Sequence, residues 1–208
     1  MGLVESKSLL TVDEYLTLER ASEEKHQYLD GHLFAMAGES GEHSDIAMNI
    51  SGLFYVHLRG KRCRPRGSNS KIRSGPAGPV SGKRAKGLFS YPDVVVICGE
   101  PEHHDRFKDV IINPTAIVEV LSPSTESFDR GEKFKRYQTW NPTLREYVLV
   151  SQDKPEVEHF SRLPDGTWKY KLHRGLKASV KLASIQYTLK LAEIYERVTF
   201  PADSDPSE

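Results

Sequence analysis

Residues 115–138 read TAIVEVLSPSTESFDRGEKFKRYQ, and this stretch decides the fold. It begins with an apolar run that has Glu119 in the middle, and a continuous apolar run is typical of a strand covered on both faces. Burying an unpaired carboxylate is costly, so Glu119 is expected to hold a cation, a metal or a proton. Ser127 or Asp129 is expected to cap the helix that follows, which ends before Pro142. The stretch therefore predicts a buried strand followed by a helix.

The remaining segments predict a mixed α/β (α+β) fold. Thr11 and Glu14 form a capping box before a helix at about 12–20, and the Asp30-Gly31 pair predicts a hairpin. Apolar residues at helical spacing predict a second helix over 44–59. Further expected elements are strands at 63–72, 88–98 and 147–151, antiparallel strands at 157–161, 168–172 and 184–189, and a short helix at 191–197. Together they predict a mixed central sheet flanked by helices, with antiparallel strands at the C-terminal end.

Length and composition are those of an ordinary globular protein. The chain has 208 residues, of which 38% are hydrophobic and 28% charged, which suits a single domain. We expect an ordered core over about 10–195 and a polar tail at 202–208. The longest apolar run, at 94–98, is too short to span a bilayer, so no membrane association is expected. Cys63 and Cys98 suit neither a disulfide framework nor a metal site, so we expect a reduced, cytoplasmic protein.

The net charge of zero hides a basic segment. No acidic residue occurs between Asp45 and Asp93, whereas ten basic residues do: Arg59, Lys61, Arg62, Arg64, Arg66, Lys71, Arg73, Lys83, Arg84 and Lys86. Such a local excess of positive charge attracts polyanions, of which nucleic acid is the most common. The alternative is a solvated loop whose charges are neutralised by acids from elsewhere in the fold.

Two carboxylates and a lysine are candidates for chemistry. Asp93 begins the run VVVI and Glu119 interrupts IVEV, so on neighbouring strands both carboxylates can point into one crevice, where a divalent cation would keep both ionised. Lys133 lies on the predicted helix and can lean over the strand end, with Tyr137 four residues later on the same face. The alternatives are that Asp93 makes a turn, that Glu119 is half of an ion pair and that Lys133 is solvated.

A resemblance to a known family becomes specific at this point. The motifs that carry it are YLDGHLFAMAG, YPDVVVICG, AIVEVLSPST, DRGEKFKRYQ and LREYVLVS, which spread over roughly residues 10–195. The chain resembles the PD-(D/E)XK nuclease superfamily and, within it, the "putative restriction endonuclease" family, long filed as a domain of unknown function. The superfamily lysine usually lies two residues after the acid, where this chain has Leu121, and Lys133 matches the lysine of this branch.

The resemblance implies a restriction-endonuclease-like core, DNA as the substrate and Mg²⁺ or Mn²⁺ as the cofactor. It implies Asp93 and Glu119 as metal ligands, the Val120 carbonyl as a third, and Lys133 as the group that orients water or stabilises charge. Asp129 is expected to cap its helix, and Tyr137 only to pack. Arg59, Lys61, Arg62, Arg64, Arg66, Lys71 and Arg73 are the candidate nucleic-acid contacts. A homodimer or higher homo-oligomer is expected.

Two departures from the family pattern concern accessory residues. Gln27 stands where relatives usually have an acid, and Asn69, expected in a strand, stands where they commonly have an aspartate. Either amide can coordinate or hydrogen-bond, but neither supplies charge. His43 matches a position near the site, or is a helix cap or a packing residue.

Three functions remain open on the sequence. The first is a Mg²⁺-dependent endonuclease that hydrolyses DNA phosphodiester bonds through metal-activated water. The second, which Gln27 and Asn69 favour, is a catalytically weakened DNA-binding or assembly module with the nuclease fold. The third is a metal-dependent hydrolase of another phosphoester.

Overall fold

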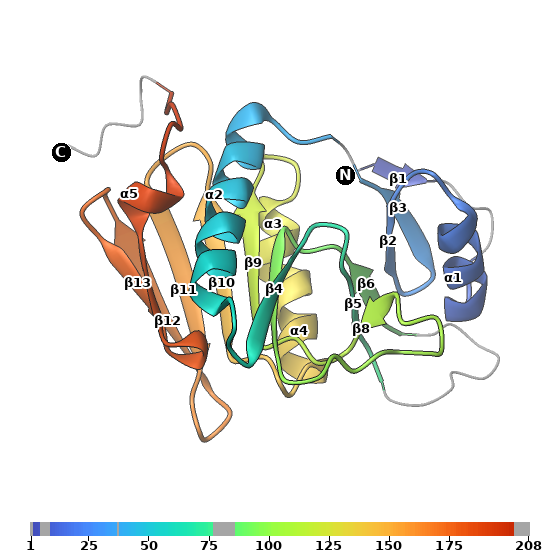
Figure 1. The fold of residues 1–208 in the computed structure, drawn as a ribbon. Coiled ribbons are helices and arrows are strands. Elements are labelled where there is room, and N and C mark those ends of the chain that lie inside the picture. Colours follow the sequence, from blue (N-terminus) through green and yellow to red (C-terminus); the bar gives the residue numbers. More distant parts are fainter. Residues whose placement is uncertain (1, 5–8, 37, 77–85, 202–208) are drawn as a thin grey trace.

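Two six-stranded sheets and a two-stranded hairpin make up the fold of the computed structural model, which describes residues 2–4, 9–36, 38–76 and 86–201. The sheets lie side by side, the first towards the N-terminal part of the chain and the second at the centre (Figure 1). The fold class is mixed α+β, with a mixed central sheet flanked by helices, as the sequence predicts. The expected tail at 202–208, and Lys83 and Arg84 of the basic segment, lie outside the described residues.

The first sheet has the strand order β1-β3-β2-β6-β5-β8 and packs against helix α1. The capping box is confirmed, because Thr11 accepts from the Glu14 backbone and the Glu14 carboxylate accepts from the Thr11 backbone. The Asp30-Gly31 turn is confirmed as well, and both residues have positive φ, as a tight hairpin turn requires. The elements are β1 (Gly2–Val4), α1 (Val12–Ala21), β2 (His26–Leu29), β3 (His32–Ala35), β5 (Lys71–Ser74), β6 (Leu88–Ser90) and β8 (Val110–Ile111).

The second sheet has the order β12-β11-β10-β9-β7-β4 and positions the site. Only β9 and β10 are parallel, and every other pair is antiparallel. Its strands are β4 (Cys63–Gly67), β7 (Val94–Cys98), β9 (Ala116–Leu121), β10 (Glu146–Ser151), β11 (Glu156–Arg162) and β12 (Trp168–Arg174). All six residues of β9 are buried, as the apolar run predicts.

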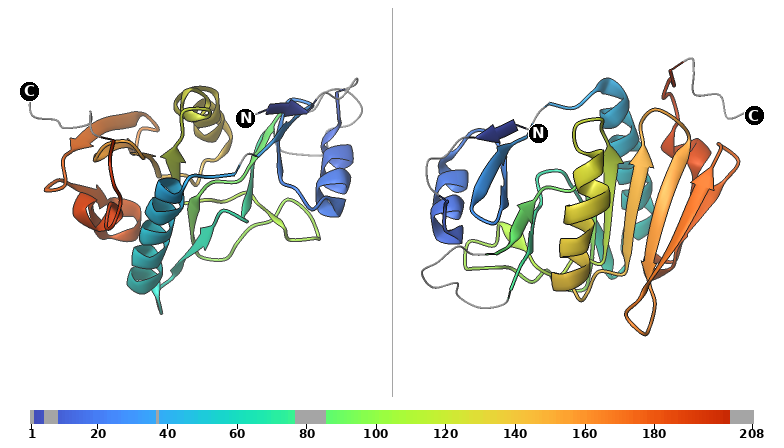
Figure 2. Two further views of the ribbon diagram at one scale, coloured as in Figure 1. Left: turned by 90° about the horizontal axis from the view of Figure 1, so that it is seen from above. Right: turned by 180° about the vertical axis from the view of Figure 1, so that it is seen from behind.

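Helices cover both faces of the second sheet (Figures 1 and 2). Helix α2 (Gly41–Leu58) packs Ile46, Ile50 and Phe54 on one face. The other face carries one helical segment made of α3 (Glu126–Phe128), a π-helical turn (Asp129–Lys133) and α4 (Phe134–Trp140). Successive residues of β9 alternate between these faces, which puts Val118 and Val120 toward α2 and Glu119 toward α4.

Two expected strands are wrong, because each is split between the sheets. Residues 63–72 form β4 of the second sheet and β5 of the first, joined by a turn at 68–70, and Asn69 is exposed in that turn instead of lying in a strand. Residues 88–98 form β6 of the first sheet and β7 of the second, joined at 91–93. The chain therefore crosses between the sheets at both places.

The C-terminal region also differs from the expected single strand at 184–189. It folds as β13 (Ser179–Leu182), a 3₁₀ turn (Ala183–Ile185), β14 (Tyr187–Lys190) and α5 (Leu191–Ile194), which ends before the predicted residue 197. The carboxylate of buried Glu146 accepts from the Ala183 backbone and the Ser184 hydroxyl. That contact fixes the 3₁₀ turn against β10.

The two cysteines form a disulfide, so the expectation that both are reduced is wrong. Cys63 and Cys98 are direct partners in the β4–β7 register, although they are 35 residues apart in sequence. Only the strand pairing brings them together, and their spacing in the sequence carries no such signal.

None of the helices in the described residues has the length and apolar character needed to cross a membrane.

Candidate active site

Six of the candidate catalytic, metal-binding and accessory residues line one open cleft of about 690 Å³. They are Gln27, His43, Asp93, Glu119, Val120 and Lys133. The lining residues come from β2 and the segments beside β2 and β3, the start of α2, the link before β7, the end of β9 and the π-helical turn. The cleft therefore lies where the two sheets meet.

Asp93 holds the end of the β7–β9 ladder. The paired part of β7 and β9 ends at Val94↔Val118, so Val120 lies two residues beyond the last β9 residue that pairs with β7. The Val120 N–H donates to Asp93 Oδ2 at 2.7 Å. Because the N–H and C=O of a strand residue point to the same side, the Val120 carbonyl is directed toward the same edge. Asp93 and the Val120 carbonyl thus share one end of the cleft.

Glu119 is paired with Lys133. The Lys133 ammonium lies 2.9 Å from Glu119 Oε1 and 2.8 Å from Asp129 Oδ1, and all three side chains are 3–4% exposed. Tyr137, which is fully buried, donates to Glu119 Oε1 at 3.3 Å and shares a hydrogen bond with Ser90. Tyr137 therefore holds Glu119 in addition to packing.

Asp129 does not cap its helix, contrary to expectation. It lies in the π-helical turn, is buried, and its side chain accepts from Lys133 four residues later. Its backbone carbonyl accepts from the Tyr147 hydroxyl at 2.9 Å. A π-helical turn is rare and widens the helix locally. Here it contains both members of the buried ion pair between Asp129 and Lys133.

The electrostatics of this group leave it short of positive charge. Burial raises the pKa of Glu119 to about 8; the Lys133 charge acts against this, while the Asp129 and Asp93 charges add to it. For Lys133 burial opposes the charged form, but Asp129 and Glu119 outweigh it and hold the pKa well above its usual range. Lys133 therefore stays charged, and a further cation near Glu119 would favour its ionised form.

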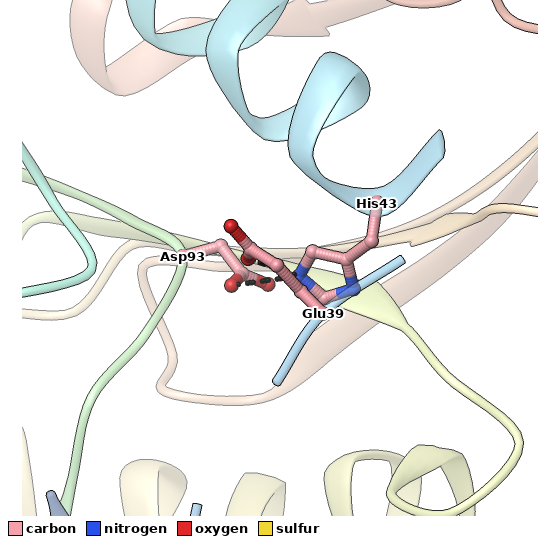
Figure 3. A group of neighbouring side chains, drawn as sticks. All are labelled: Glu39, His43 and Asp93. Atoms are coloured by element: carbon pink, nitrogen blue, oxygen red, sulfur yellow. Dashed lines mark hydrogen bonds and ion pairs between the residues drawn. The ribbon is translucent and has the colours of Figure 1, made fainter. Parts of the chain in front are cut away.

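His43 and Glu39 lie beside Asp93 at the start of α2 (Figure 3). His43 Nε2 is 3.0 Å from Asp93 Oδ1 and 3.6 Å from Glu39 Oε2. Burial opposes protonation, yet the Asp93 hydrogen bond and the Asp93 and Glu39 charges raise the pKa of His43 above its ordinary value. The ligand atoms of these three residues all lie within 4.8 Å of one another, the only such His, Cys, Asp or Glu group among the described residues. Glu119 is outside that group.

Gln27 and Tyr91 complete the wall formed by the first sheet. Gln27 is 5% exposed, lines the cleft, and its Oε1 has no hydrogen-bond partner. A buried amide oxygen without a protein partner is uncommon, and this one is available to coordinate or accept from a group in the cleft. The Tyr91 hydroxyl donates to buried Glu19 at 2.6 Å, which anchors the chain two residues before Asp93.

The predicted nucleic-acid contacts are only partly at the surface. Arg59, Lys61, Arg62 and Arg64 are exposed and Arg66 is half-buried. Arg59 lies sixteen residues after His43, so it is about 24 Å from it along the axis of α2. None of these residues lines the cleft.

Lys71 and Arg73 are turned inward. Lys71 is 4% exposed, with its ammonium over the rings of Tyr15 and Tyr91, so its assignment as a nucleic-acid contact is wrong. The Arg73 guanidinium is half-buried, donates to the Pro76 carbonyl and contacts His104 Nδ1. Asn69 does not line the cleft either.

Sequence reasoning missed several cleft residues. Glu39 lies just before the Ser40 N-cap, whose hydroxyl accepts from the His43 backbone, and no sequence pattern marks it. Ser122, Ser124 and Thr125 of the quoted stretch also line the cleft. Their position directly after the Glu119 strand was the one available signal.

Comparison with known proteins places this architecture in a family. The model of the Uma2 family, described as "putative restriction endonuclease", matches residues 12–192. The chain belongs to this family. Two uncharacterised Synechocystis proteins are similar to it: one is 36% identical over 191 residues, covering 92% of this chain and 94% of the relative. The other is 32% identical over 168 residues, covering 81% and 89%.

A solved structure shares the fold of this chain. A crystal structure from Anabaena variabilis, described as a putative nuclease belonging to DUF820, superposes with a TM-score of 0.70 at 16% identity. The match covers 89% of this chain and 97% of that one. This likeness concerns the fold.

Proposed function

We propose that the protein is a Mg²⁺- or Mn²⁺-dependent endonuclease that hydrolyses DNA phosphodiester bonds. The observation that carries this proposal is that Asp93 from the link before β7, Glu119 from β9 and Lys133 from the π-helical turn all line one open cleft. Family membership supports nuclease chemistry, and the cleft supplies the carboxylates and the cation that this chemistry requires.

The side chains of the cleft fit a divalent cation. Glu119 and Asp93 offer carboxylate oxygens, Gln27 offers an amide oxygen that has no partner, and Glu39 and His43 lie against Asp93. Oxygen donors suit Mg²⁺ and Mn²⁺, and an imidazole is compatible with Mn²⁺. A divalent cation held by Asp93, Glu119 and the Val120 carbonyl would lower the pKa of a water molecule and neutralise phosphate charge.

The protein's own residues orient the reacting groups. The Lys133 ammonium, fixed by Asp129 and Glu119, offers positive charge to a phosphate that enters the cleft. Tyr137 restricts the rotation of Glu119, and His43 that of Asp93. Because these contacts exist before any substrate binds, little reorganisation is needed during the reaction.

Exposed basic residues after α2 are the proposed contacts for the DNA backbone. Lys61, Arg62 and Arg64 lie at the surface, and Arg66 pairs with Val95 two residues after Asp93. Phosphate contacts of this kind do not depend on base sequence and weaken as salt rises.

Cleavage of supercoiled plasmid tests the proposal. The wild-type protein is expected to nick or linearise DNA with Mg²⁺ or Mn²⁺ and not with EDTA. Asp93→Asn and Glu119→Gln remove charge while keeping shape, and each is expected to lower the rate at least about a hundredfold. Glu100→Gln is the matched control, because Glu100 is exposed and lies outside the cleft.

Three results would decide against this function or site. Cleavage that persists in both cleft variants would place the chemistry elsewhere. Retention of DNA without cleavage at any metal concentration would favour the catalytically weakened binding module. Hydrolysis of small phosphoesters alone would favour the third alternative.

A further inference from the structure

The outer face of α2 exposes apolar side chains that nothing in the described chain covers. Met48, Tyr55 and Val56 are 69%, 61% and 71% exposed, more than any other large apolar side chain among the described residues. Figures 1 and 2 show α2 standing out from the second sheet with no other described element over its outer side. Exposed apolar groups gathered on one helix indicate an interaction surface.

Gly52 lies at the centre of this face and has no internal reason to be glycine. It is in the middle of α2, its φ is not positive, and a Cβ added there would have no atom within 4 Å. Glycine inside a helix lowers helix stability relative to alanine. Its useful property at this place is that it lets another backbone approach closely from outside.

The residues around Gly52 are arranged symmetrically. Met48 and Val56 lie four residues before and after it, and Asp45 and Arg59 lie seven before and after. At 3.6 residues per turn all of them fall on the same side of α2. Asp45 and Arg59 are exposed, and neither side chain makes an ion pair or hydrogen bond with any other described residue.

We propose that this face pairs with itself, so that α2 of two copies packs antiparallel about a twofold axis at Gly52. The glycines then face each other, and Met48 lies against Val56 of the partner subunit. Asp45 lies near Arg59 of the partner subunit, and the twofold axis repeats this pair on the other side. The two charges lie about 10 Å on either side of the axis, at 1.5 Å per residue.

A second copy fits this surface better than another partner. Glu42 and Asp45 are exposed near the N-terminal end of α2. Their negative charges would repel the phosphates of a nucleic acid at that end of the face. Opposite charges at equal distances from a central glycine suit an isologous interface, where one patch must match itself. Because one helix pair is a small contact, we expect a dissociation constant on the order of micromolar.

Sedimentation velocity of the full-length protein over a concentration series tests the pairing. The wild type is expected to pass from monomer to dimer. Asp45→Arg and Arg59→Asp, each of which opposes like charges, should raise the dissociation constant at least about tenfold. The Asp45→Arg/Arg59→Asp double variant restores opposite charges and should dimerise within about threefold of wild type.

Two further variants locate the axis. Gly52→Cys should cross-link to its own copy under mild oxidation, because the two residues meet at the axis. The matched control is Lys135→Cys, an exposed position on α4 on the opposite face of the second sheet, which should not cross-link. Circular dichroism checks that each variant is folded.

Specific results would overturn either the pairing itself or its antiparallel register. A wild-type protein that stays monomeric at several hundred micromolar, or a dimer that both single charge variants leave unchanged, overturns the proposal. Weakening by both single variants without rescue by the double variant overturns the antiparallel register. None of these residues lines the cleft, so loss of dimerisation is distinguishable from failure of the proposed nuclease.

Discussion

Replacing Glu119 with glutamine is the most informative single change in the metal-free protein. Glutamine has nearly the shape of the protonated carboxylic acid but cannot ionise. Glu119 is 3% exposed, and burial raises its pKa to about 8 despite the ammonium of Lys133. We therefore expect Glu119→Gln to be as stable as wild type in acid and more stable in base.

The sign and size follow from proton linkage. In the unfolded chain the acid ionises near its model value of 4.5, and in the folded chain near 8. Between those values the folded state binds one more proton, so wild-type stability falls as pH rises. At about 1.4 kcal/mol for each tenfold change in the protonation equilibrium, the loss is at most about 5 kcal/mol. We expect a difference of about 2 to 5 kcal/mol above pH 8.

Urea denaturation in EDTA, at intervals from pH 5 to pH 9, measures this difference. The gap between variant and wild type should open as pH rises and level off above about 8. Adding Mn²⁺ should then stabilise wild type by about 2.7 kcal/mol at a hundredfold excess over its dissociation constant, and the variant much less.

A gap that does not change with pH would refute the reasoning. It would mean that Lys133 keeps Glu119 ionised throughout, and that the carboxylate is already neutralised before any metal binds. Glu100→Gln, at an exposed carboxylate, should show no pH-dependent gap.

Three other changes test separate contacts. Lys133→Met leaves two buried carboxylates without their cation, so unfolding free energy at pH 8 should fall by about 3 to 5 kcal/mol in urea titrations. Reducing the Cys63–Cys98 disulfide reopens a loop of 35 residues and should lower unfolding free energy by about 2 to 4 kcal/mol, measured with and without reductant. In an NMR titration the pKa of His43 should lie above 6.5, and Asp93→Asn should lower it, because the first contact that favours the charged form is lost.

The first two of these changes have matched controls. Lys135→Met removes an exposed lysine from the same helix and should change stability by less than about 0.5 kcal/mol. A Cys63→Ser/Cys98→Ser protein should show no response to reductant. A His43 pKa at or below the ordinary value of 6.5 would contradict the Asp93 contact.

Local signals in the sequence were sufficient wherever the physics is local. The Thr11 capping box and the Asp30-Gly31 turn depend on residues within a few positions, and both are confirmed. Glu119 stood out because a carboxylate in an apolar strand requires a partner, and the structure gives it Lys133. Contacts of this kind follow from residue type and short spacing.

What the sequence did not reveal depends on distant segments. Lys71 is buried because the rings of Tyr15 in α1 and Tyr91 in the β6–β7 link lie against it. No residue near Lys71 in the sequence indicates this burial. The residue type and position of Asp129 predict a helix cap, because a π-helical turn is too rare to expect. The Gly-Ser-Asn-Ser residues at 67–70 are typical of a turn, but they do not show that the strands on either side belong to different sheets.

The crossing at 91–93 has a mechanical consequence. It is one of the places where the chain passes between the sheets, and it delivers Asp93 directly to the cleft. Asp30 and Arg136 join the hairpin turn of the first sheet to α4 through two hydrogen bonds, of 2.8 and 2.6 Å, so the sheets are tied together on the α4 side as well. The cleft thus lies between two sheets that are also held together by a contact outside its lining residues. Substitutions at Asp30 or Arg136 are therefore expected to change the width of the cleft while every side chain that lines it stays the same.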